Sequence, residues 1–217
     1  MSKYNQGILG PFSGKVGTVV GSFWKGRFVM RSRPTHMTNP NTPEQQAQRL
    51  RFSLVSENIA PMRPAINAGF AIRGDIENVT PANVAMQVNM EQAVTGSGTV
   101  LSIDWTRWMV SGGTLLNVES PSATAAASHK ITMSWTNNSG VRADVLDNDS
   151  VMVVAYNPTK KEASIDMVTM VRDDESGQLN VPASWVGDTV QVFVFARSED
   201  KTRVSPSVNA GSVIILA

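Results

Sequence analysis

The chain has 217 residues and a formal net charge of +1, with 41% hydrophobic and only 17% charged residues, against a usual charged share of about 25%. This apolar content is enough to bury a core, which excludes wholesale disorder. The chain has no cysteine and only two histidines, His36 and His129, which excludes disulfides and thiol catalysis and leaves most triad and metal-hydrolase schemes without residues.

Charge is unevenly distributed along the chain. Residues 1–51 carry eight Lys and Arg against the single acid Glu44, whereas residues 52–217 carry 11 bases and 17 acids. This asymmetry predicts a basic arm attached to an acidic body. Nucleic acid would suit such an arm. We favour the acidic surface of a neighbouring copy instead, because complementary charge within one sequence suits self-assembly.

The first 41 residues predict a glycine-rich arm that contains a β-hairpin. Two runs rich in β-branched and aromatic residues, 16–24 and 27–32, flank Lys25-Gly26, which predicts a tight turn. An isolated hairpin is marginal in water, so this one needs a body or a neighbour to cover it. The candidate assembly residues are Lys15, Val19, Phe23, Trp24, Lys25, Arg27, Phe28, Arg31 and Arg33.

Residues 42–97 predict a helical segment. Apolar residues recur at helical spacing over 43–59 and 81–94. Thr42 and Thr80 precede these runs and are suitable N-caps. Prolines follow the first run, and we expect them to end that helix.

From residue 98 onward the apolar period changes to two, which predicts strands. Many short strands separated by turns are typical of an immunoglobulin-like or fibronectin-type β-sandwich, so we expect a mainly β fold with this sandwich over 98–217. The run 188–196 is apolar on both sides of its pleat, which predicts a central strand or one covered by another layer. The predicted strands are 99–105, 106–111, 114–118, 129–135, 150–157, 162–171, 177–181, 188–196 and 203–216.

An acidic segment contains Asp144, Asp147 and Asp149. Carboxylates of this kind could hold Ca²⁺, but the EF-hand glycine and closing glutamate are missing, so we favour a solvated loop. Four tryptophans could stack on the rings of a bound sugar, which would indicate carbohydrate binding. The alternation around Trp135 instead predicts that this tryptophan lies in the core. The four tryptophans are Trp105, Trp108, Trp135 and Trp185.

Catalytic signals are missing from the sequence. There is no GxSxG or HExxH motif, the glycines of GPFSGKVG lack the spacing of a phosphate loop, and His129 has no carboxylate near it in the sequence. We therefore expect a non-enzymatic protein with no catalytic residue, no cofactor and no resident metal.

The segment GILGPFSGKVGTVVGSFWKG, followed by RSRP and NTPEQQAQRLRF, resembles a family of Bacteroidota proteins known only as a domain of unknown function. The similarity continues through SWTNNSG and VPASWVGDTVQVFVF and covers nearly the whole chain. That family has no established activity, so the resemblance transfers no catalytic residue.

A looser similarity links the N-terminal part to small phage and prophage proteins of virion-module type. It consists of a glycine-rich hairpin followed by NPxTxxQxxxR and an aromatic residue, although the Trp-rich helix of that pattern is missing. The matching residues are Asn39, Pro40, Thr42, Gln45, Arg49 and Phe52.

The looser similarity implies a structural protein of a phage or phage-like particle, such as a head-decoration, connector or tail component. Its partners would be further copies of the chain and other particle proteins. The N-terminus shows no apolar signal segment and no run long enough to cross a bilayer, so we expect synthesis in the bacterial cytoplasm and a place in the virion. The alternative is a cell-associated binding module that recognises a glycan or protein through its sandwich loops.

Overall fold

The computed structural model describes residues 3–4, 10–34 and 41–217. The chain divides into two compact units, which we call the arm unit (Met1–Asn41) and the body (Thr42–Ala217). His36, Asn39 and Pro40, which the sequence singled out, lie outside the described residues.

The arm unit contains an antiparallel sheet with the strand order β1-β2-β3-β4. The predicted hairpin between β3 and β4 is confirmed, and its turn residues Lys25 and Gly26 have positive φ angles of 44° and 78°. Two positive φ values are the mark of a type I′ turn, whose twist suits a hairpin. The run 16–24 was predicted as one strand, but a turn after Val16 splits it. The strands are β1 (Lys3–Tyr4), β2 (Phe12–Val16), β3 (Val19–Trp24) and β4 (Arg27–Ser32).

Four helices open the body, namely α1 (Pro43–Ile59), α2 (Arg63–Gly69), α3 (Ala71–Glu77) and α4 (Pro81–Gln92). The helices predicted over 43–59 and 81–94 are confirmed as α1 and α4. The hydroxyl oxygens of Thr42 and Thr80 accept hydrogen bonds of 3.4 and 3.3 Å from backbone N–H groups in the first turns. The sequence did not predict α2 or α3. Pro64 stands in the first turn of α2, where proline is tolerated, so it begins a helix as well as following one.

Three antiparallel sheets complete the body. The first is the hairpin of β5 (Val94–Ser97) and β6 (Val100–Ile103). The other two have the strand orders β11-β8-β7 and β10-β9-β12-β13. Their strands are β7 (Glu119–Ala126), β8 (Lys130–Thr136), β9 (Ser150–Asn157), β10 (Glu162–Val171), β11 (Ser176–Asn180), β12 (Thr189–Arg197) and β13 (Val208–Ile214).

Two strand predictions were wrong. Residues 106–111 and 114–118 form a connection between β6 and β7 instead of strands. Their apolar side chains, among them Trp108 and Leu115, are buried. The apolar residues of this stretch are therefore explained by burial of a loop and not by a β-strand. Conversely, β7 was missed because its sequence, ESPSATAA, has no large apolar residue.

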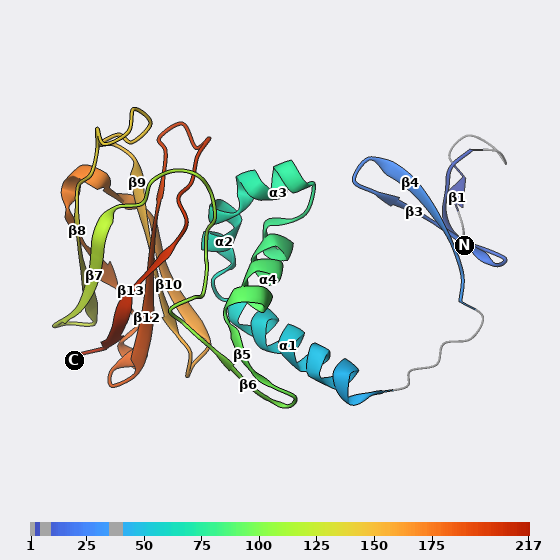
Figure 1. The fold of residues 1–217 in the computed structure, drawn as a ribbon, viewed down its shortest axis with the longest axis horizontal. Coiled ribbons are helices and arrows are strands. Elements are labelled where there is room, and N and C mark those ends of the chain that lie inside the picture. The colour runs from blue at the N-terminus through green and yellow to red at the C-terminus, as the bar shows by residue number, and fades with distance from the viewer. Residues whose placement is uncertain (1–2, 5–9, 35–40) are drawn as a thin grey trace. The chain divides into compact units, whose positions relative to one another are not determined.

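Strands β9 and β12 are buried on both faces. On one face, Met152, Val154 and Phe193 share a core with helices α1, α2 and α4. On the other face, Val153 and Val192 share a second core with β8 and β11. Figure 1 shows the helices on one side of this sheet and β7 and β8 on the other. Strand β12 lies between β9 and β13 and is covered on both faces, so both alternatives predicted for 188–196 are confirmed.

The described residues form a mixed, mostly β fold with four helices and antiparallel sheets. Among those residues, none of the helices is both long and apolar enough to cross a membrane.

Candidate functional site

The β3–β4 hairpin sorts its side chains by type, because successive side chains of a strand point to opposite faces. Phe23 pairs with Phe28, and Gly21 pairs with Met30, so these positions share one face. The ring of Phe12 on β2 covers Gly21, where an added Cβ would lie 2.8 Å from the ring. We call this side the apolar face, made of Phe12, Val16, Val19, Phe23, Phe28 and Met30.

The opposite side of the hairpin is basic. Trp24 pairs with Arg27, and Val20 pairs with Arg31; Lys15 on β2 pairs with Val20 from the other edge. We call this side the cationic face, made of Lys15, Val20, Trp24, Arg27, Val29 and Arg31. The nine candidate assembly residues were predicted from the sequence as a single group. In the structure, most of them are divided between the apolar face and the cationic face.

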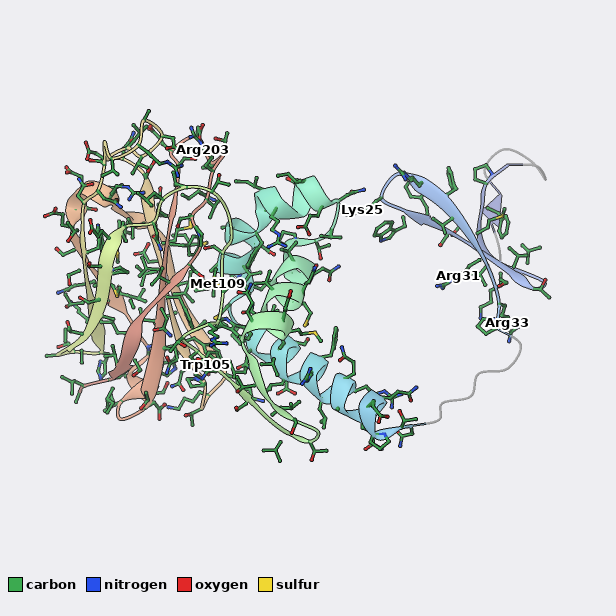
Figure 2. The ribbon with its side chains drawn as sticks, in the orientation of Figure 1. Lys25, Arg31, Arg33, Trp105, Met109 and Arg203 are labelled. Carbon is green, nitrogen blue, oxygen red and sulfur yellow. The ribbon has the colours of Figure 1, made fainter. Side chains whose placement is uncertain are left out.

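Two of the nine residues lie outside the strands. Lys25 is in the turn, with its Nζ 5.6 Å from the centre of the Trp24 ring, a distance at which a cation is attracted to an aromatic face. Arg33 follows β4, and its backbone N–H donates to the carbonyl of Thr18 at 2.7 Å. Figure 2 shows Lys25 at the closed end of the hairpin and Arg31 and Arg33 towards its open end.

Large apolar side chains of the arm unit are exposed within that unit. Phe23, Trp24, Phe28 and Met30 are 59%, 60%, 52% and 69% exposed. Gly21 alone is buried among the described residues of the unit. The arm unit thus presents aromatic surface without burying a core of its own.

The cations of the arm unit also lack neutralising groups there. Residues 1–41 contain six of the 19 Lys and Arg residues and no Asp or Glu. No ion pair is present among the described residues of the unit. The body therefore holds 13 bases and all 18 acids, so the two units have opposite net charge.

Negative charge in the body concentrates at one end of its sheets, which we call the loop end (residues 137–149, 172–175 and 198–203). Eight acids stand there against four bases. Hydrogen bonds join the three segments: the Asn137 amide donates to Asp147 at 2.8 Å and to Asp173 at 3.3 Å, and the Asn148 amide donates to Glu199.

The three aspartates that suggested a calcium loop have separate partners. Asp144 pairs with Arg142 at 2.5 Å and with Arg203 at 2.8 Å. The hydrogen bond from Arg142 holds the pKa of Asp144 well below its usual range. Asp147 accepts hydrogen bonds from Ser139, which lowers its pKa most, and from Asn137. In the part of the chain that the structure describes, no group of three or more His, Cys, Asp or Glu could hold a metal ion.

Asp149 corrects the expectation of a solvated loop, because its side chain is fully buried beside the equally buried Arg172 at 3.2 Å. The guanidinium also donates to Asn138 and to the carbonyl of Leu116. Burial lowers the pKa of Arg172, and the charge of Asp149 opposes that effect. No signal in the sequence separated Arg172 from the exposed acids Asp173 and Asp174 that follow it.

A cavity of about 450 Å³, which we call the body cavity, lies between helices α3 and α4 and two connecting segments, 109–114 and 202–206. Its size falls within the usual range of ligand sites, about 300–1,000 Å³. Figure 2 shows Met109 and Arg203, two of its lining residues. The apolar part of the lining includes Phe70, Ile72, Val88, Met109, Val204 and Pro206. Sequence reasoning missed this cavity because its residues come from separate parts of the chain.

Tryptophans of the body do not form an exposed stacking platform. Trp108, Trp135 and Trp185 are buried, which confirms the prediction that Trp135 lies in the core. Trp105 is half-buried, with its ring centre 5.5 Å from that of Trp108 and 5.3 Å from that of Tyr156.

Comparison with known proteins identifies a family for the chain. A family model described as "Family of unknown function (DUF6266)" matches residues 11–211. The search of curated proteins returned no match. The family match spans nearly the whole chain and confirms the resemblance to a domain of unknown function. The chain belongs to the DUF6266 family.

Proposed function

We propose that the protein is a non-enzymatic structural component of a phage or phage-like particle, such as a head-decoration, connector or tail protein, and that it assembles through its arm unit. The two-faced sheet of the arm unit carries this proposal. Burying apolar surface stabilises a contact by about 25 cal/mol per Å², so exposed Phe23, Phe28 and Met30 favour association. Contiguous apolar patches on soluble proteins commonly mark such contacts.

We propose that β7–β13 form an immunoglobulin- or fibronectin-type sandwich. The orders β11-β8-β7 and β10-β9-β12-β13 correspond to A, B and E on one sheet and C, C′, F and G on the other when the strands are lettered in chain order. Since folds of this class serve many functions, the functional proposal rests on the arm unit and not on the fold.

The proposed partners are further copies of the chain and other proteins of the particle. Opposite net charges in the arm unit and the body favour contact between copies, because complementary charge steers association and penalises wrong partners. Nucleic acid is the less favoured partner of the arm. The proposed location is the virion, after synthesis in the bacterial cytoplasm.

Deleting residues 1–33 is expected to abolish self-association and leave the body folded. The body contains both large cores, whereas the arm unit buries little. Size-exclusion chromatography with light scattering measures association, and thermal melts of the full and shortened chains measure folding. Unchanged self-association of the shortened chain would refute the role of the arm.

Raising the salt concentration is expected to weaken self-association without eliminating it. Salt screens exposed charges over about 8–10 Å at physiological ionic strength, but contacts of the apolar face persist. Light scattering and a gel shift with a labelled DNA duplex, run across one salt series, make the comparison. Tight duplex binding by a monomer, falling steeply with salt and without self-association at any salt, would instead establish the arm as a nucleic-acid contact.

The body cavity favours a second candidate function, a cell-associated binding module that recognises a glycan or protein through its loops. Its volume of about 450 Å³ suits a small ligand or a few side chains. Symmetric particles of the purified chain in negative-stain microscopy support the structural role. A ligand held in the cavity by a monomer supports the binding module.

A further inference from the structure

We propose that the tip of the β3–β4 hairpin (residues 23–28, the hairpin tip) binds in the body cavity of a second copy. Phe23 and Phe28 enter the cavity, and Lys25 in the turn lies against acidic side chains beside it. This inference rests on the proposed function and deepens it, since it names the surface that receives the arm.

The hairpin tip combines an aromatic pair with two cations. Phe23 and Phe28 are directly opposite each other, with ring centres 4.8 Å apart and planes tilted by 56°. Such tilted pairs are stable as a unit, so the two rings can enter a pocket together. Lys25 lies in the turn between them, and Arg27, the first residue of β4, belongs to the cationic face. The tip is thus apolar on one side and positively charged at its end.

The body cavity matches the aromatic pair in size and polarity. An apolar protein cavity of about 150 Å³ holds one benzene molecule, so about 450 Å³ has room for two phenyl rings. Phe70, Met109 and Val204 provide an apolar lining. Ile76 also lines the cavity and is 79% exposed, so apolar surface continues outward from it.

Acidic side chains adjoin the cavity through a shared residue. Arg203 lines the body cavity and also a smaller hollow formed with Asp144, Glu199 and Asp200. Hydrogen bonds from Ser198 and from the backbone and hydroxyl of Thr202 lower the pKa of Asp200 to about 2, so it is ionised at neutral pH. Four acids line this hollow together with Arg203. Asp144 and Asp149 are paired with arginines, so Glu199 and Asp200 are the carboxylates that complement the hairpin tip.

Charge also decides between a second copy and an acidic ligand. Both arginines that line the cavity are already paired: Arg73 with Glu77 at 2.7 Å, and Arg203 with Asp144 at 2.8 Å. These carboxylates already neutralise the charge that would attract an anionic ligand. An apolar occupant with positive charge does not depend on that charge, and the hairpin tip of another copy supplies one.

The test uses full-length chains and follows the dissociation constant of self-association by sedimentation. Phe28→Ala and Ile76→Arg are each expected to weaken association about 30-fold or more, as loss of a central apolar contact does. Lys25→Glu and Glu199→Lys should each weaken it about tenfold, and the double variant should restore it, because the pair is then attractive again. Phe28 lies on the apolar face, Ile76 lies on the exposed apolar surface beside the cavity, and Lys25 lies in the turn. Thermal melts verify the folding of every variant, including Glu199→Lys.

Arg31→Glu is the matched control, since it reverses a charge on the same hairpin but away from the hairpin tip. It should change association less than Lys25→Glu does. An equal effect would show that general electrostatics, and not the hairpin tip, governs the contact, and would overturn the inference.

Cross-linking between copies gives an independent measurement, because the chain has no cysteine. A Lys25→Cys chain mixed with a Glu199→Cys chain should form heterodimers with a short bis-maleimide. The control partner is Val168→Cys, a site that is 82% exposed on β10, and it should cross-link far less. Equal yields with both partners would overturn binding to a second copy.

Failure of this inference is distinguishable from failure of the proposed function. If deletion of residues 1–33 abolishes association but the tip and cavity variants associate like the parent chain, the arm binds elsewhere and the inference is wrong. If the deletion has no effect, the proposed role of the arm is itself wrong.

Discussion

Replacing Trp135 with alanine is expected to lower the free energy of unfolding by about 3–5 kcal/mol, as truncation of a large buried aromatic side chain does. The side chain is 5% exposed and belongs to the core shared by the two larger sheets of the body. Its indole N–H donates to the carbonyl of Arg172 at 2.9 Å. The alanine variant therefore loses apolar contacts, leaves a cavity and removes a partner of a buried carbonyl.

Denaturant unfolding of the full chain measures this loss. Trp24→Ala is the control, because Trp24 is 60% exposed in the arm unit and surface substitutions usually change stability by less than about 0.5 kcal/mol. A Trp135→Ala variant as stable as the Trp24→Ala variant would show that Trp135 is not a core residue.

Helix starts, the hairpin turn and the burial of Trp135 were predicted correctly, because they depend on residues that are close together in the sequence. Thr42 and Thr80 mark helix starts because their hydroxyls can satisfy free backbone N–H groups of the first turn. Lys25-Gly26 marks the hairpin because the turn needs two positive φ angles. The alternation around Trp135 predicted its burial, which the structure confirms.

Predictions failed where burial comes from distant parts of the chain. Trp108 and Leu115 belong to a buried connection, and their apolar character alone does not distinguish a buried loop from a strand. Strand β7 shows the opposite case. Its small and polar residues give no apolar pattern, yet β7 pairs with β8, with one register shift between Glu119 and Ser122.

The arrangement of the residues selected for the arm could not be predicted from composition alone. Sequence composition selected the basic and aromatic side chains of the arm, and strand pairing then placed Phe23 and Phe28 on one face and Arg27 and Arg31 on the other. The body cavity depends on helices α3 and α4 meeting two distant segments. No local pattern contains that information.

Arg172→Ala is expected to destabilise the body by about 3–5 kcal/mol, because it leaves the buried carboxylate of Asp149 without its counter-charge. Both side chains are fully buried, with 3.2 Å between Arg172 Nη2 and Asp149 Oδ2. Removal of the guanidinium also takes a donor from Asn138 and from the carbonyl of Leu116. The exposed pair of Arg73 and Glu77 provides the control, and Arg73→Ala should cost only about 0–1 kcal/mol.

The double variant Arg172→Met with Asp149→Leu is expected to recover most of that loss. Replacing a buried ion pair by apolar side chains of similar size is often neutral, because desolvation of both charges is avoided. Asp149 Oδ1 and Arg172 Nε make no hydrogen bond among the described residues, so the pair is incompletely satisfied and its net contribution is small. Denaturant unfolding of Arg172→Met, Asp149→Leu and the double variant gives the coupling energy between the two side chains. A double variant as unstable as Arg172→Ala would instead show that the hydrogen bonds from Arg172 to Asn138 and Leu116 hold the loop end together.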